Sequence, residues 1–162
     1  MANDEETISR LGPVFLDSYF VIDHERRIKS FNDGFVQLSG VRRAQRKDLT
    51  GSPCFERLRL EICETRCIAA ECLKQGAPVR MEEVKGTASD GRELVLELSA
   101  IPLKNDQGEV TGVFVTHRDV TDERRLKSRY EELEETRVRE RDALVDVIKD
   151  REAQLEKLRK SK

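Results

Sequence analysis

The sequence lacks tryptophan, has only two histidines, and draws 5% of its 162 residues from the aromatic types. It also lacks any stretch approaching the roughly 20 apolar residues that a bilayer-spanning helix needs, so we expect no membrane segment. Residues 1–6 are acidic and lack the basic start and apolar run of a secretory signal. These absences predict a cytoplasmic protein, in which cysteines stay reduced and need an explanation other than disulfides.

Charge is abundant but balanced, with 30 Lys and Arg residues against 32 Asp and Glu residues. No face-sized block of basic residues is present to bind a phosphate backbone, so we expect no direct nucleic-acid partner. Phosphate-cradling glycine loops, kinase motifs and an assembled Ser-His-Asp order are also missing, and we therefore do not expect an enzyme. The length allows one core of ordinary size plus an appendage.

The apolar pattern predicts an α+β domain over residues 14–120, preceded by an N-terminal segment, residues 1–13. Two strands are expected first, followed by a short helix that begins near Asn32 and ends near Gly40. A helical middle follows, with residues 63–73 expected as one continuous helix. Alternating apolar residues then predict three more strands, which gives two strands, several short helices and three strands in that order.

Several residues that punctuate these elements resemble the PAS family of sensor domains over roughly residues 14–122. They are Ile28, Asn32, Gly40, Leu49-Thr50-Gly51, Asp90-Gly91 and Asp119-Val120-Thr121. The resemblance implies a five-stranded antiparallel sheet with short helices on one face, enclosing a pocket, and a final strand that joins an output helix. The family binds haem, flavins, small acids, metals or nothing, so the function has to come from the site.

All four cysteines fall within 19 residues, at the spacing C-x8-C-x3-C-x4-C: Cys54, Cys63, Cys67 and Cys72. Cys63 and Cys67 are expected on one face of the helix, with Cys72 turned away from that line. Four thiolates in one short region favour an iron–sulfur cluster or a tetrahedral zinc ion. We therefore predict that all four are cofactor- and metal-binding residues.

An iron–sulfur cluster is the first expectation for these cysteines, and zinc is the alternative. The spacing is similar to that of cysteine-bearing bacterial variants of the PAS family, which supports a cluster by resemblance. A thiol-disulfide switch and inert thiols that fill a helix–sheet interface remain open. Haem and flavin are disfavoured, because His24 and His117 lie outside any expected helix and no cysteine has the Asn-Cys-Arg-Phe-Leu context of flavin photochemistry.

Residues 121–162 predict a long coiled-coil helix for output and dimerisation. Its apolar residues recur at three-to-four spacing: Leu126, Tyr130, Leu133, Leu144, Val147, Ile148, Leu155 and Leu158. Arg137 and Glu140 interrupt the stripe, a stutter that locally unwinds a coiled coil. A helix with so narrow a stripe is poorly stable alone, so we expect a parallel homodimer through residues 121–160, with a frayed monomeric helix as the alternative.

Together these features predict a signal-transduction sensor of oxygen or redox state, which acts on a signalling partner or on an effector domain outside this chain. The alternative functions are a PAS module that binds a small metabolite and a dimerisation adaptor. In both alternatives the cysteines are inert or hold structural zinc.

Overall fold

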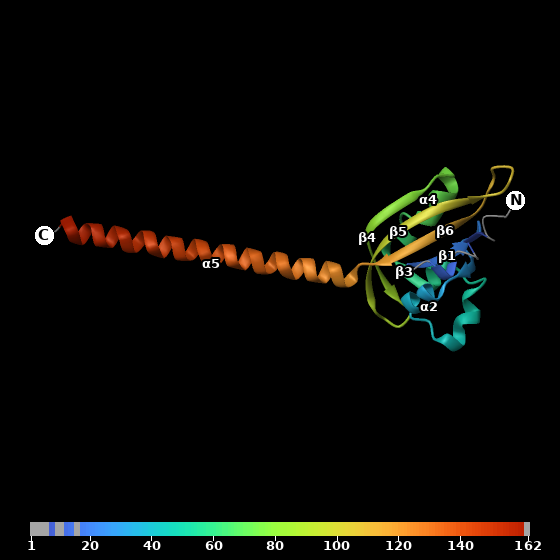
Figure 1. Ribbon diagram of the computed structural model, residues 1–162, viewed down its shortest axis with the longest axis horizontal. Coiled ribbons are helices and arrows are strands. Elements are labelled where there is room, and N and C mark those ends of the chain that lie inside the picture. The colour runs from blue at the N-terminus through green and yellow to red at the C-terminus, as the bar shows by residue number, and fades with distance from the viewer. Residues whose placement is uncertain (1–6, 9–11, 15–16, 161–162) are drawn as a thin grey trace. The chain divides into compact units, whose positions relative to one another are not determined.

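The computed structural model describes residues 7–8, 12–14 and 17–160, so the predicted N-terminal segment, residues 1–13, lies largely outside the described residues. The chain divides into two compact units, Met1–Thr121 and Asp122–Lys162. The first unit holds an antiparallel sheet with short helices, and the second is the continuation of one long helix (Figure 1).

The sheet has six strands, in the order β2-β1-β6-β5-β4-β3. Their bounds are β1 (Ser18–Ile22), β2 (Ile28–Phe31), β3 (Leu58–Leu60), β4 (Val79–Ala88), β5 (Glu93–Lys104) and β6 (Val110–Asp119). The helices are α2 (Asp33–Ser39), α3 (Cys54–Arg57), α4 (Ile68–Gln75) and α5 (Thr121–Lys160), with 3-10 turns η1 (Gly12–Val14), η2 (Arg43–Leu49) and η3 (Glu61–Cys63). Pairing of β1 with β6 makes the first and last strands neighbours inside the sheet, and neither is an edge strand.

The predicted α+β architecture is confirmed, including both ends of its first helix. The Asn32 side chain accepts hydrogen bonds from the backbone N–H groups of Phe35 and Tyr19, each at 3.0 Å, so it caps α2 and ties the helix to β1. Gly40 ends α2 in the left-handed region at φ 68°.

The helical middle was predicted wrongly at two places. Residues 58–60 form the short strand β3, which pairs with β4 through Leu58↔Ala88 and Leu60↔Gly86, so the sheet gains one strand beyond the five expected. Gly86 permits this pairing, because a Cβ atom there would lie 2.5 Å from Cδ2 of Leu60. The continuous helix expected over residues 63–73 is also absent, since η3 ends at Cys63 and α4 begins only at Ile68.

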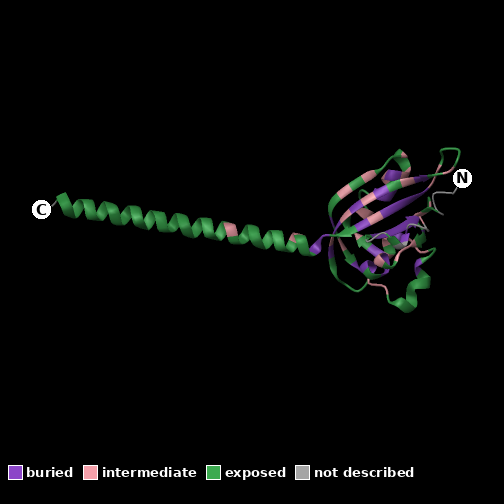
Figure 2. Cartoon of the chain, in the orientation of Figure 1, coloured by how far each residue is buried: buried purple, intermediate pink, exposed green. Residues whose placement is uncertain are grey.

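The main core lies between the sheet and the short helices. Leu94, Leu96 and Leu98 of β5 point into this core, as the alternating pattern predicted, and buried and partly exposed residues alternate along the strand (Figure 2). A smaller apolar cluster is formed by Tyr19, Val21, Leu103 and Phe114. Because side chains alternate along a strand, these residues belong to the opposite face of the sheet.

Helix α5 has 40 residues, which gives a length of about 60 Å at the standard rise. Its predicted stripe is exposed in the single chain; Leu133, for example, exposes 62% of its surface and Leu144 exposes 64%. Among the described residues, no helix is both long and apolar enough to cross a membrane.

Candidate cysteine and histidine site

Three of the four cysteines line one small cavity within the main core. Cys54 comes from the first position of α3, Cys63 from the end of η3, and Cys67 from the position just before α4. The cavity has a volume of ≈ 30 Å³, which is room for about two water molecules. Apart from His117, its other walls are apolar: Phe20, Leu58, Leu60, Ile62, Ile68, Ala69, Leu98 and Val115.

Cys63 and Cys67 reach the cavity by a different route from the predicted shared helix face. A tight turn separates them, in which the Arg66 N–H donates to the Ile62 carbonyl at 2.9 Å. The three thiols therefore come from three separate segments of chain. Donors from different segments can approach one ion from different directions, which a tetrahedral site requires.

Cys72 stands apart from these three residues. It is fully buried within the core on α4 and does not line the cavity. Burial raises the pKa of the Cys72 thiol, and no other cysteine contributes to that rise. The structure thus brings together three of the four predicted ligands.

Burial and the neighbouring cysteines raise the pKa of two cavity thiols, those of Cys54 and Cys63. Burial raises the pKa of Cys54 to about 12, with further increases from Cys67 and Cys63, while Arg26 and the backbone of Phe55 lower it. Burial also raises the pKa of Cys63, which a hydrogen bond with the Leu60 backbone partly offsets. Thiols that influence one another in this way lie close together, and a bound cation would stabilise their thiolate forms.

Arg26 provides a positive charge beside the thiols. Its guanidinium carbon lies 4.9 Å from the centre of the Phe55 ring, and its carbonyl accepts the N–H of Cys54 at 3.0 Å. Arg26 and Phe55 also line an open groove of ≈ 920 Å³, and Cys63 borders both this groove and the small cavity. Cys63 therefore lies where a small solute can approach the cavity from solvent.

His117 is the site residue that the sequence reasoning set aside. It exposes 2% of its surface, and its ring lies 4.6 Å from that of Phe20 and 5.7 Å from that of Phe35. It lines the same cavity as the three cysteines. Burial lowers the pKa of His117 to about 4, against the opposing effect of a hydrogen bond with the Ser18 backbone.

The alternation of side chains along β6 predicts that His117 is buried. Val113 and Val115 belong to the main core, and His117 is the next residue of that face. A histidine at this position of the alternation is enclosed by the core, although it lies on a strand and not on a helix.

The donor types around the cavity suit a soft or borderline metal ion, because thiolate and imidazole groups favour zinc, iron and copper over magnesium or calcium. Within the part of the chain that the structure describes, no three His, Cys, Asp or Glu side chains already converge on a metal position. Binding therefore requires the thiols to turn toward one another, since cysteine reorients by rotation about a single χ1 bond.

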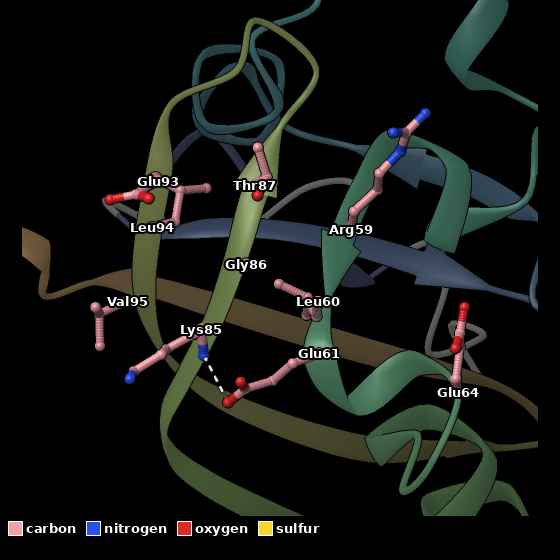
Figure 3. Close-up of a pocket in the computed structure, with 10 residues that line it drawn as sticks. All are labelled: Arg59, Leu60, Glu61, Glu64, Lys85, Gly86, Thr87, Glu93, Leu94 and Val95. Atoms are coloured by element: carbon pink, nitrogen blue, oxygen red, sulfur yellow. Dashed lines mark hydrogen bonds between the residues drawn. The ribbon is translucent and has the colours of Figure 1, made fainter.

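A second groove lies beside β3 and is chemically different. Figure 3 shows Glu61, Glu64 and Glu93 around it, together with Arg59 and Lys85, in a volume of ≈ 680 Å³. The backbone N–H of Lys85 donates a hydrogen bond to the Glu61 carboxylate at 3.3 Å, next to the paired strands β3 and β4. This groove is open and charged with both signs, so it presents no enclosed site.

The start of α5 is bonded to the sheet at β5. The Val120 N–H donates to the carbonyl of Val95 at 2.9 Å, and the Val95 N–H donates to Thr121 Oγ1 at 2.9 Å. The Asp119 side chain accepts the N–H of Thr121 at 3.0 Å. Strand β6 thus passes into α5 within two residues, and His117 lies four residues before Thr121.

The family model described as the PAS fold matches residues 16–125, which is most of the first unit. The chain belongs to the PAS family. No curated protein matches the chain. The family match agrees with the element order, with the sheet topology and with a last strand that leads into a long helix.

Several solved structures share this fold at low sequence identity. A PAS domain from Colwellia psychrerythraea is 17% identical with a TM-score of 0.58, and the match covers 74% of this chain and 99% of that one. The PAS domain of the fruit-fly ELK potassium channel is 18% identical with a TM-score of 0.55, covering 75% and 99%. An RNA-binding light-oxygen-voltage receptor is 19% identical with a TM-score of 0.60, covering 81% of this chain and 36% of that one. Identities this low establish the fold alone.

Proposed function

We propose that this PAS chain is a signal-transduction sensor that reads oxygen or redox state through a metal or iron–sulfur centre at the cysteine cavity, and that a dimeric α5 is its output. The observation that carries the proposal is the convergence of Cys54, Cys63 and Cys67, from three separate segments, on one cavity in the core. Thiols that only fill space have no reason to line one cavity from three separate segments.

Residues of this chain would both bind the centre and transmit its state to α5. The three thiols would hold the centre, and Arg26 beside them offsets part of the negative charge that thiolates bring. A bound centre would supply sensitivity to oxidants, and its loss would leave α3, η3 and α4 no longer tied together. Since α4 packs on β5 and β6, such a change reaches the strand that leads into α5.

The small cavity bears on the choice between an ion and a cluster. At ≈ 30 Å³ it admits a single ion with little displacement, whereas an iron–sulfur cluster has to push the three segments apart. The proposal includes both a single ion and a cluster, and the content of acid-labile sulfide distinguishes the two. A cluster contains inorganic sulfide, while zinc or a single iron ion does not.

The test is the metal and sulfide content of the full chain purified without oxygen, together with its absorption spectrum. We expect about one centre per chain, with thiolate-to-metal charge-transfer bands if iron is present. Cys54→Ser, Cys63→Ser and Cys67→Ser should each lose or weaken the centre, whereas the matched variant Cys72→Ser should keep it. Protein that stays colourless and metal-free after reconstitution with iron and sulfide, or with zinc, contradicts the proposal.

A second candidate is a PAS module that binds a small metabolite in the same place. Its support is the largely apolar lining of the cavity and the ligand complex named for a structural neighbour, Vibrio cholera VqmA, which is 21% identical with a TM-score of 0.56 over 73% of this chain and 51% of that one. The cavity has to open well beyond its present volume to admit such a molecule. Mass spectrometry of small molecules released by denaturing the purified protein tests this alternative.

A further inference from the structure

We infer that His117 is the fourth ligand of the cysteine site, in place of Cys72, so that Cys54, Cys63, Cys67 and His117 hold one tetrahedral divalent ion of the zinc class. This inference rests on the cavity of the proposed function and makes it specific. It changes the donor set from four sulfurs to three sulfurs and one nitrogen, and it adds a ligand on the strand that leads into α5.

The position of the His117 ring is the first support. The ring borders the same cavity as the three thiols, and only 2% of the residue's surface is exposed. It lies on β6, while the thiols come from η3 and the starts of α3 and α4. The sheet therefore supplies one donor and the helical layer supplies three, on opposite sides of one small space.

The unsatisfied nitrogen of His117 is the second support and is independent of the cysteines. Among the described residues, His117 Nδ1 is one of two buried side-chain atoms of nitrogen or oxygen that lack a hydrogen-bond partner, the other being Ser18 Oγ. A buried polar atom without a partner destabilises the fold, so such an atom points to a place where a ligand or water can bind. A metal ion in the cavity supplies the missing partner.

The local charges and hydrogen bonds fit an ion with three thiolates. Three thiolates, one neutral imidazole and a divalent ion carry a net charge of −1, and the Arg26 guanidinium lies close enough to act on Cys54 and Cys63. Hydrogen bonds link Cys54 to the Phe55 backbone and Cys63 to the Leu60 backbone. Such outer contacts orient ligands and stabilise sulfur-bound metals.

Binding must move the donors, since none of the described groups yet converges on a metal position. The three thiols turn inward as they lose their protons to solvent, and His117 binds through its free nitrogen as a neutral ring. The ion then joins α3, η3 and α4 to β6. The bound ion therefore contacts β6 directly, at His117, four residues before α5 begins at Thr121.

The test uses Co²⁺ as a spectroscopic probe, titrated without oxygen into reduced, metal-free full chain. We expect one Co²⁺ per chain, with thiolate-to-cobalt charge-transfer bands of three sulfurs and the ligand-field bands of a tetrahedral site. His117→Gln should weaken binding by at least about 10-fold and change the ligand-field bands. His24→Gln, an exposed histidine, and Ser18→Ala, the strand partner of His117, should bind like the unmodified chain.

His117→Cys distinguishes ligation from a structural role. A fourth thiolate should restore binding and raise the sulfur-to-cobalt band above that of the unmodified chain, which a merely space-filling residue cannot explain. Should the histidine variants fold poorly, nitrogen-15 spectra of the unmodified chain still decide the matter, because it has only two histidines. Zn²⁺ should then shift the ring nitrogens of His117 and leave those of His24 in place.

Two negative results are distinguishable. If Co²⁺ binds with thiolate bands but His117→Gln has the same affinity and spectrum, or if Zn²⁺ leaves the His117 ring nitrogens unshifted, the inference is wrong while the cysteine site stands. If the unmodified chain shows no thiolate-to-cobalt band and retains no cluster after reconstitution, the proposed function fails with it.

Discussion

His117 is buried in its neutral form, so its protonation is linked to folding. Burial lowers its pKa to about 4, against 6.5 in an unfolded chain. Between these two values the unfolded chain binds more protons than the folded one, so the contribution to stability is present above pH 6.5 and is lost as the pH falls toward 4.

We predict that the metal-free protein loses about 2 kcal/mol of unfolding free energy between pH 7 and pH 5 through His117 alone. Urea unfolding at both pH values measures this loss. Carboxylates contribute to the pH dependence of the unmodified chain and of His117→Gln alike, so the difference between these two proteins isolates the effect of His117. His117→Gln should be less stable at pH 7, and its stability should depend less on pH. His24→Gln is the control and should keep the full pH dependence. Parallel pH profiles for the unmodified chain and His117→Gln would show that the buried ring does not titrate in this way.

Cys72 contributes to the core and not to the cavity, and it is fully buried on α4. Cys72→Ser places a hydroxyl in an apolar environment, so the unfolding free energy should fall by about 1–3 kcal/mol while metal content stays the same. Thermal unfolding and metal analysis of the same preparation measure both quantities. If folded Cys72→Ser lost its metal, Cys72 would have to be a metal ligand.

The clustering of the cysteines predicted a shared site, and the structure places three of them around one cavity, with His117 in the lining and Cys72 outside it. Cys72 is only five positions from Cys67, yet α4 begins between them and turns Cys72 into the core. His117 lies more than 40 positions from the nearest cysteine, and only the pairing of strands brings β6 beneath the helical layer. Spacing along the chain reports local geometry, whereas the set of residues that lines this cavity depends on the pairing of strands in the sheet.

At the level of elements, strand β3 fixes where Cys63 lies. It pairs with β4 at Gly86 and passes directly into η3, which ends at Cys63. A side chain at position 86 would meet Leu60 Cδ2 at 2.5 Å and the Arg59 carbonyl at 2.8 Å. The close pairing of β3 with β4 therefore depends on glycine.

We predict that Gly86→Ala destabilises the fold by about 1–3 kcal/mol and weakens metal binding, because β3 has to move away and takes Cys63 with it. Chemical unfolding and a Co²⁺ titration measure the two effects. The neighbouring variant Lys85→Ala keeps the backbone bond to Glu61 and should change neither quantity by more than a small amount. Equal behaviour of the two variants would mean that β3 adjusts without disturbing the site.

The elements that the sequence predicted well are those with a strong local signal. Asn32 and Gly40 bound α2, and strict alternation identified β5. Strand β3 was missed because three residues give too little periodicity to separate a strand from a helix, and because its partner lies about 28 positions later in the chain. Long-range pairing, not local preference, determines this part of the structure.

At the level of the whole molecule, the apolar stripe of α5 predicts dimerisation. A chain that ends at Thr121 should be monomeric, and the full chain should have twice the mass expected for one copy in light scattering. Ile148→Gln, which alters a stripe residue with 56% of its surface exposed, should weaken the dimer. Lys149→Gln is the matched control beside it and should not. Full-length and shortened proteins of the same oligomeric state would show that α5 is not the principal interface.

In the proposed sensor, occupancy of the cysteine cavity is transmitted along β6 to α5. Hydrogen exchange of the full chain, compared with and without bound metal, tests this transmission, because amide protection reports local opening along the whole chain. We predict that metal slows exchange in residues 54–72, in β6 and in the first turns of α5, and that Cys63→Ser removes all three effects together. Slower exchange at residues 54–72 with no change in β6 or α5 would contradict the proposed transmission, because the site would then bind metal without signalling to the output helix.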